Sequence, residues 1–202
     1  MAHYQPHDKF YRKARAQGLP SRAAFKIEEL IARFKLIRRG ARVIDLGCAP
    51  GGWLAVLAHA AGPEGFVVGV DLARCTIAAG NIRTIAGDIR DSKVQSKVTS
   101  QLGGQADLVT CDVAPKLSGI VDRDQARSHE LLMDALGFAR GALRPDGAMV
   151  AKLFMGGDFN ELIAPFREAF ALVDLTRTKA TRPGSSELYL VARGHRALDS
   201  GI

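Results

Sequence analysis

Short apolar segments alternate with amphipathic ones along most of this 202-residue chain, and the alternation limits the folds available to it. The apolar segments are rich in Val, Ile and Leu and lie at 41–47, 65–73, 82–89, 106–114 and 148–154. The segments between them, at 54–62, 91–103, 124–143 and 158–170, have the apolar spacing of helices. Strands that are apolar along their whole length are typical of a parallel sheet covered on both faces. The pattern therefore predicts a doubly wound α/β fold.

Both ends of the chain add elements to this sheet. Residues 171–180 and 186–194 are predicted to pair as a terminal hairpin, and "RPDG" at 144–147 predicts a turn before a strand. A helix is expected around "SRAAFKIEELIARFKLI". We therefore expect a Rossmann-like, mostly parallel seven-stranded sheet with an antiparallel terminal strand and helices on both faces. Residues 1–40 would form a basic arm and helix belonging to the same domain, 41–195 its main body and 196–202 a tail.

The stretch "VIDLGCAPGGW" at 43–53 ends the first predicted strand in a glycine-rich turn. Gly47, Gly51 and Gly52 are expected to let a ligand lie against the backbone. The turn lacks the spacing of a dinucleotide fingerprint, because Ala49 stands where a glycine is needed, and it lacks the Lys-Ser/Thr of a P-loop. The turn therefore predicts a ligand of another kind.

Aspartates lie at the carboxyl ends of four of the predicted strands, and they indicate the charge of that ligand. They are Asp45, Asp71, Asp88 and Asp112. Ligands of doubly wound sheets bind outside the carboxyl ends of the strands, and an acid after the second strand can accept hydrogen bonds from both ribose hydroxyls. Each aspartate alone is more typical of a turn or a helix cap than of a ligand contact. Together they disfavour a diphosphate and favour S-adenosylmethionine, a sulfonium with a ribose, which predicts a class I methyltransferase.

The positive charge of the chain is concentrated near its beginning. Residues 1–42 hold 11 Lys and Arg against 3 acids, or +8, while the other 160 residues hold 17 against 18, or −1. A concentrated basic segment is typical of a protein that binds a polyanion, and interleaved aromatic residues favour RNA. The predicted RNA-binding residues are Lys9, Arg12, Lys13, Arg15 and Arg22.

Composition excludes several other classes of protein. No segment reaches the roughly 18 apolar residues of a membrane span, and the N-terminal residues are polar, so a cytoplasmic protein is expected. The three cysteines, Cys48, Cys75 and Cys111, are too scattered for a disulfide framework or a zinc site, so no metal is expected. We expect a monomer.

The order and spacing of seven short motifs resemble those of the FtsJ/RrmJ-like RNA 2′-O-ribose methyltransferases. The motifs are "SRAAFKIEEL" (21–30), "DLGCAPGGW" (45–53), "VVGVDL" (67–72), "GDI" (87–89), "DVAPKLSG" (112–119), "AKLF" (151–154) and "SSELYLVA" (185–192). The resemblance implies transfer of a methyl group from S-adenosylmethionine to a ribose 2′-hydroxyl. It also implies ribosomal RNA of the large subunit as partner, with a uridine as the modified nucleotide.

The resemblance further implies which residues act. It assigns a catalytic tetrad to Lys26, Asp112, Lys152 and Glu187. It assigns cofactor contacts to Gly51, Trp53, Asp71, Asp88 and Asp112, beside the Asp45, Gly47 and Gly52 of the glycine-rich turn. Lys152 lies inside an apolar strand, where a charge is costly unless it is paired or functional. The sequence leaves open whether Lys152 removes the hydroxyl proton or stays charged and stabilises the developing alkoxide.

Three positions depart from the commoner residues of this family, and other functions stay open. Cys48, Met155 and Ser186 stand where Ala, Gln and Arg are frequent, and the last two concern the choice of acceptor. The alternatives are a 2′-O-methyltransferase acting on tRNA, a non-catalytic RNA-binding factor in ribosome assembly, and a methyltransferase of small molecules or proteins. The glycine spacing disfavours a nicotinamide oxidoreductase.

Overall fold

The computed structural model describes residues 23–197 except 76, 78–79, 116–117, 156–158 and 183. The predicted RNA-binding residues, Lys9, Arg12, Lys13, Arg15 and Arg22, lie outside this part of the chain, and so does most of the predicted tail. Within the described residues, no helix is both long and apolar enough to cross a membrane.

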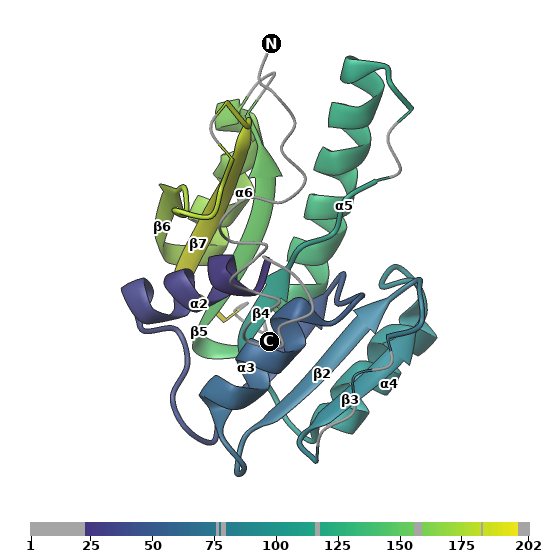
Figure 1. Cartoon of the computed structure of the whole chain (residues 1–202), viewed down its shortest axis with the longest axis vertical. Coiled ribbons are helices and arrows are strands. Elements are labelled where there is room, and N and C mark those ends of the chain that lie inside the picture. Colours follow the sequence, from purple (N-terminus) through teal and green to yellow (C-terminus); the bar gives the residue numbers. More distant parts are fainter. Residues whose placement is uncertain are drawn as a thin grey trace, which may run out of the picture.

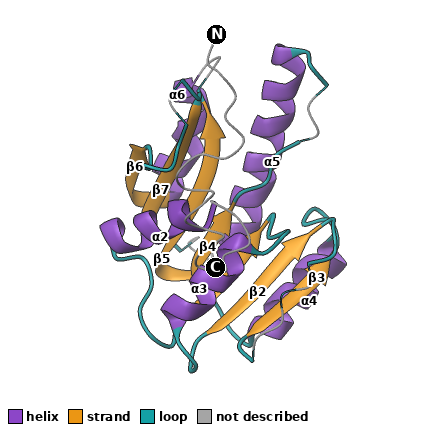
Figure 2. Ribbon diagram, in the orientation of Figure 1, coloured by secondary structure: helices purple, strands orange, loops and turns teal. Residues whose placement is uncertain are grey.

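The described strands form one seven-stranded sheet in the order β3-β2-β1-β4-β5-β7-β6 (Figures 1 and 2). The strands are β1 (Arg42–Leu46), β2 (Phe66–Asp71), β3 (Ile82–Ala86), β4 (Ala106–Cys111), β5 (Leu143–Phe154), β6 (Phe170–Thr176) and β7 (Glu187–His195). Strands β1 to β5 pair in parallel, and β7 runs antiparallel to both β5 and β6. The predicted doubly wound sheet with an antiparallel terminal strand is confirmed.

Helices cover both faces of this sheet, as the apolar strands require. They are α2 (Ala23–Phe34), α3 (Gly52–Ala61), α4 (Ser92–Leu102), α5 (Val121–Ala142) and α6 (Phe159–Ala169). Helices α2 and α3 share a buried cluster with one face of the sheet, and α4, α5 and α6 share another cluster with the opposite face. Alternate strand residues belong to different clusters, as Val43 and Ile44 of β1 do. This is the expected consequence of a strand buried on both sides.

The largest difference from the sequence-based boundaries lies in β5. This strand pairs with β4 at Leu143 and again from Ala148, while β4 advances only from Ala106 to Leu108. The residues 144–147 therefore bulge out of β5 instead of forming a turn before it, and Asp146 there has a φ of 60°. The strands β1 to β4 also end one to three residues earlier than predicted, so that the chain leaves the sheet at the level of the aspartates.

Candidate active site

A cavity of about 280 Å³ lies outside the carboxyl ends of β1, β2, β3 and β4. Its position is the one expected in a doubly wound sheet, because β1 has β2 on one side and β4 on the other, and the strand order reverses there. Three of the four predicted aspartates line it: Asp71, Asp88 and Asp112. With Arg90 as the one cation among the lining residues, the cavity carries net negative charge and fits a cationic ligand.

The glycine-rich turn between β1 and α3 forms one side of this cavity, through Gly47 and Ala49. Gly47 and Gly51 have φ values of 78° and 110°, which other residues adopt only with strain. A Cβ at Gly47 would lie 2.8 Å from the backbone nitrogen of Val113, and one at Gly51 would meet the end of the Ile77 side chain. The backbone conformation of both positions, and the close backbone contact at Gly47, thus already favour glycine, which is a different reason from the predicted approach of a ligand.

Asp71 holds the turn in place while it lines the cavity. Its Oδ2 accepts a hydrogen bond of 3.0 Å from the backbone N–H of Ala49, and its Oδ1 accepts one of 2.8 Å from that of Ala73. Each carboxylate oxygen keeps a second lone pair for a ligand hydroxyl. Asp88 accepts bonds from both the side chain and the backbone of Arg90, which hold the pKa of Asp88 below its usual range.

Asp45, Gly51, Gly52 and Trp53, which were also predicted to bind the cofactor, do not line the cavity. Asp45 is fully buried, and its Oδ1 accepts a hydrogen bond of 2.7 Å from Thr110. Burial is the main cause that raises the pKa of Asp45 to about 8. Trp53 is also buried; its Nε1 donates a 3.0 Å hydrogen bond to the backbone oxygen of Ala23, which ties α3 to α2.

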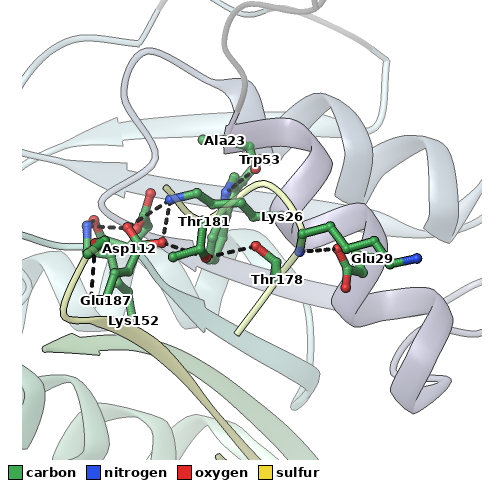
Figure 3. Close-up of polar contacts among 11 residues, drawn as sticks. Ala23, Lys26, Glu29, Trp53, Asp112, Lys152, Thr178, Thr181 and Glu187 are labelled. Carbon is green, nitrogen blue, oxygen red and sulfur yellow. Dashed lines mark hydrogen bonds and ion pairs between the residues drawn. The ribbon is translucent and has the colours of Figure 1, made fainter. Parts of the chain in front are cut away.

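The four predicted tetrad residues come together beside the cavity, although they are far apart in the sequence (Figure 3). Lys26 of α2 donates hydrogen bonds of 2.6 and 2.8 Å to the two carboxylate oxygens of Glu187, the first residue of β7. Lys152 of β5 lies 2.8 Å from Oδ1 of Asp112, which follows β4. Lys152 also donates a hydrogen bond of 3.1 Å to the backbone oxygen of Asp112. The arrangement is thus two ion pairs side by side, of which only the Asp112 carboxylate is exposed to the cavity.

Burial shapes the electrostatics of this cluster. The side chains of Lys26, Glu187 and Lys152 are 9%, 13% and 11% exposed, and that of Asp112, which lines the cavity, is 25% exposed, so water screens these charges only in part. Burial raises the pKa of Asp112, and the positive charges of Lys152 and Lys26 oppose that rise. A buried charge pair that loses one partner leaves the other charge uncompensated, which is costly. The two members of each pair therefore hold one another in position.

Comparison with known proteins identifies the family of this chain. Residues 19–195 match the FtsJ-like methyltransferase family. The chain belongs to the FtsJ-like methyltransferase family. It is 44% identical over 186 residues to a ribosomal RNA large subunit methyltransferase E of Methanothrix thermoacetophila, covering 92% of this chain and 72% of that protein. It is 42% identical over 195 residues to the protein of the same name from Myxococcus xanthus, covering 96% of this chain and 92% of that protein.

Solved structures support the same fold. A structure described as a ribosomal RNA methyltransferase from Plasmodium falciparum has a TM-score of 0.76 at 24% identity and covers 88% of this chain and 99% of its own. Human methyltransferase-like protein 13 in complex with SAH has a TM-score of 0.60 at 14% identity, with 86% of this chain and 84% of the other covered. The predicted family and fold are confirmed.

Two of the departures from the common FtsJ-like residues lie together beside Glu187. The backbone N–H of Met155, just after β5, donates a 2.9 Å hydrogen bond to the backbone oxygen of Ser186, just before β7. Met155 is 52% exposed, and Arg177 lies 3.5 Å from its sulfur. Cys48, the third departure, is buried beneath the turn.

The structure also adds lining residues that sequence reasoning missed. Leu72, Ile89, Arg90 and Leu131 line the cavity, and Leu72 is 75% exposed. The first three lie one or two residues after Asp71 or Asp88, so their proximity to predicted site residues was available in the sequence. Leu131 of α5 reaches the cavity only through the packing of that helix, which no local motif indicates.

Proposed function

We propose that this protein transfers a methyl group from S-adenosylmethionine to a ribose 2′-hydroxyl of large-subunit ribosomal RNA. The observation that carries the proposal is the meeting of four distant residues, Lys26, Asp112, Lys152 and Glu187, beside an acid-lined cavity in an FtsJ-like chain. The relatives named ribosomal RNA large subunit methyltransferase E support the choice of RNA.

The residues of the cavity fit the proposed methyl donor. S-adenosylmethionine supplies an electrophilic methyl group on a positively charged sulfur. Asp71 would accept hydrogen bonds from the ribose hydroxyls of the donor, and Asp88 and Leu72, which also line the cavity, would receive its adenosine part. Asp112 would lie nearest to the positively charged end, because its carboxylate both lines the cavity and contacts Lys152.

Lys152 is proposed to act on the acceptor hydroxyl. Its Nζ contacts Asp112, which lines the cavity, so a hydroxyl that approaches the donor from the side of Glu187 would meet Lys152. There it would take up the 2′-hydroxyl proton, or remain charged and stabilise the developing alkoxide. Lys26, fixed by both oxygens of Glu187, would orient the ribose, and correct alignment supplies much of the acceleration.

Methyl transfer from labelled S-adenosylmethionine tests the proposal. We expect incorporation into 23S rRNA or 50S particles from cells that lack this activity, and a backbone that resists alkaline cleavage at the labelled nucleotide, because a 2′-O-methyl group cannot attack the phosphate. Label in tRNA alone would favour the tRNA alternative. Label on a base, or no label in any RNA, would contradict the proposal.

A Lys152→Met variant separates the chemistry from cofactor binding. We expect methyl transfer to fall by at least the 10²-fold typical of a lost acid–base group, with S-adenosylmethionine affinity by calorimetry nearly unchanged. Lys93→Met, which removes an exposed lysine on α4, is the matched control and should keep full activity. Transfer by Lys152→Met at the rate of the control would refute the role of Lys152.

A further inference from the structure

The connection between α2 and β1 lies at the end of the sheet opposite the cavity (Figure 1). The backbone N–H of Gly40 donates to the oxygen of Ala61 at the end of α3, and that of Phe66 donates to Ala41, which places the connection beside the start of β2. Since β1 has five residues and a strand rises about 3.3 Å per residue, this end lies ~16 Å from the glycine-rich turn.

Cationic side chains gather at this end, from segments far apart in the sequence. They are Lys35, Arg38, Arg39, Arg42, Arg144 and Arg193, which we call the distal basic patch. Four of them line a hollow of about 200 Å³, together with Phe34, Asp107 and Asp146. Six cations thus face three carboxylates, counting the Asp174 that pairs with Arg193. The patch keeps a net positive charge in a chain whose residues 43–202 carry −1.

Asp107 fixes the arginines at the centre of the patch. Its Oδ1 lies 3.2 Å from Arg38 and 2.9 Å from Nε of Arg144, while its Oδ2 accepts a 2.9 Å bond from the backbone N–H of Arg42. Burial alone would raise the pKa of Asp107, but these bonds together hold it below its usual range. Asp107 therefore stays ionised, and the guanidinium groups keep N–H donors directed away from it.

Two further cations of the patch have no acidic partner among the described residues. Lys35 and Arg39 are exposed, and no carboxylate of residues 23–197 that the structure describes lies within ion-pairing distance of either. Arg39 also borders a second hollow, beside His59 and Asn81 on the side of α3. Positioned arginine forks next to unpaired cations are suited to phosphates, which arginine binds in a bidentate manner.

We propose that the distal basic patch binds the phosphate backbone of the RNA substrate at a place remote from the methylated nucleotide. The inference rests on the proposed function, because it takes the polyanion to be that RNA. The acceptor ribose must lie at the carboxyl ends of the strands, where Lys152 is, so the patch contacts a different segment of the folded RNA. It thereby contributes affinity and orientation without a part in the chemistry.

The salt dependence of RNA binding tests this proposal directly. Lys35→Gln/Arg39→Gln removes two charges that stabilise no ion pair described above, and Lys93→Gln/Lys97→Gln removes two exposed charges from α4 as a matched control. Each phosphate contact contributes about 0.7–0.9 to the slope of log K against log salt concentration. We therefore expect the patch variant to lower the slope for 23S rRNA by about 1.6 and the control to leave it nearly unchanged.

Kinetics and cross-linking supply the second readout. The patch variant should raise KM for RNA while kcat and the affinity for S-adenosylmethionine remain those of the wild type. A photoreactive group on Arg39→Cys should cross-link to RNA away from the methylated nucleotide. Equal slopes in the patch and control variants would overturn the proposal, as would a change in sedimentation that reveals the patch as a contact between two copies.

The two proposals fail in different ways. Suppose that the patch variant lowers the salt dependence of 23S rRNA binding but the wild-type protein transfers no methyl group to this RNA. The proposed function is then wrong, and the proposed RNA contact at the distal basic patch is supported. If it methylates the RNA and the patch variant matches the control, only the patch is wrong.

Discussion

Replacement of Asp45 by asparagine should change how the stability of the fold depends on pH. Asp45 is fully buried, and its Oδ2 has no hydrogen-bond partner among the described residues. Its pKa is raised to about 8, whereas an aspartate in an unfolded chain titrates near 3.9. Between these values the folded state binds the proton and the unfolded state does not. The free energy of unfolding must therefore fall as the pH rises through this range.

The size of the effect follows from the same two values. Each unit of pKa difference corresponds to about 1.4 kcal/mol, so Asp45 should lower the free energy of unfolding by roughly 3 kcal/mol between pH 5 and pH 7. Asp45→Asn removes this proton and keeps an oxygen that can accept the hydrogen bond from Thr110. Thr110→Val removes the bond that lowers the pKa of Asp45, so its titration should move to higher pH.

Urea unfolding of wild type and Asp45→Asn at pH 5, 6, 7 and 8 measures the effect as a difference, in which other titrating groups cancel. We expect the variant to gain on the wild type by about 1.4 kcal/mol per pH unit between pH 5 and pH 7. A difference that stays constant within ~0.5 kcal/mol, the typical limit of additivity, would show that Asp45 is ionised throughout and would refute the reasoning.

Three further changes test other parts of the structure. Burial lowers the pKa of His195, so the folded state resists its protonation; the free energy of unfolding should fall as the pH drops below about 6.5, and urea curves of His195→Gln should lack that fall. Lys26→Met should lower the free energy of unfolding by about 3–5 kcal/mol because it leaves the charge of Glu187 without its partner. In the same urea assay, the double change Lys26→Met/Glu187→Gln should lower it by less than the sum of the two single changes. Trp53→Phe removes the hydrogen bond to Ala23 and part of a buried ring. It should lower the free energy of unfolding, measured by calorimetry, by more than the about 1 kcal/mol of the bond alone; no loss would show that neither the bond nor the packing of this ring stabilises the contact between α2 and α3.

The sequence predicted the strands better than it predicted the roles of single residues. A strand buried on both faces can be recognised from a short apolar run of the sequence, such as "RVIDL" or "FVVGVD". The strands predicted from these two runs agree with β1 and β2 to within two residues at either end. The cavity followed from topology, which brings Asp71, Asp88 and Asp112 to one edge. Asp45 is different, because its side chain lies beneath the turn and not in the cavity. The sequence gives the position of an aspartate on a strand but not the direction of its side chain.

The bulge in β5 shows a second limit of local patterns. "RPDG" has the composition of a turn, and Asp146 does take a positive φ there, yet the strand resumes its pairing with β4 on both sides. Arg144 in this bulge contacts Asp107 of β4, a residue 37 positions away. The conformation therefore depends on a partner that the segment itself does not contain, and only the assembled sheet decides between a turn and a bulge.

The tetrad itself depends on the finished fold in the same way, and this bears on how activity and stability are linked. Lys26 and Glu187 are 161 residues apart and meet only when α2 packs beside β7, the strand that pairs with β5. Lys152 and Asp112 meet only through the pairing of β4 with β5. Lys26, Glu187 and Lys152 are largely excluded from water in the folded state, so neither pair persists in a partly opened state, where each charge is solvated separately. Opening of β7 away from β5 would remove Glu187 from the tetrad and leave intact the cavity outside β1, β2, β3 and β4. Mild denaturant should therefore abolish methyl transfer at concentrations where S-adenosylmethionine still binds, and simultaneous loss of the two would mean that the sheet opens as one unit.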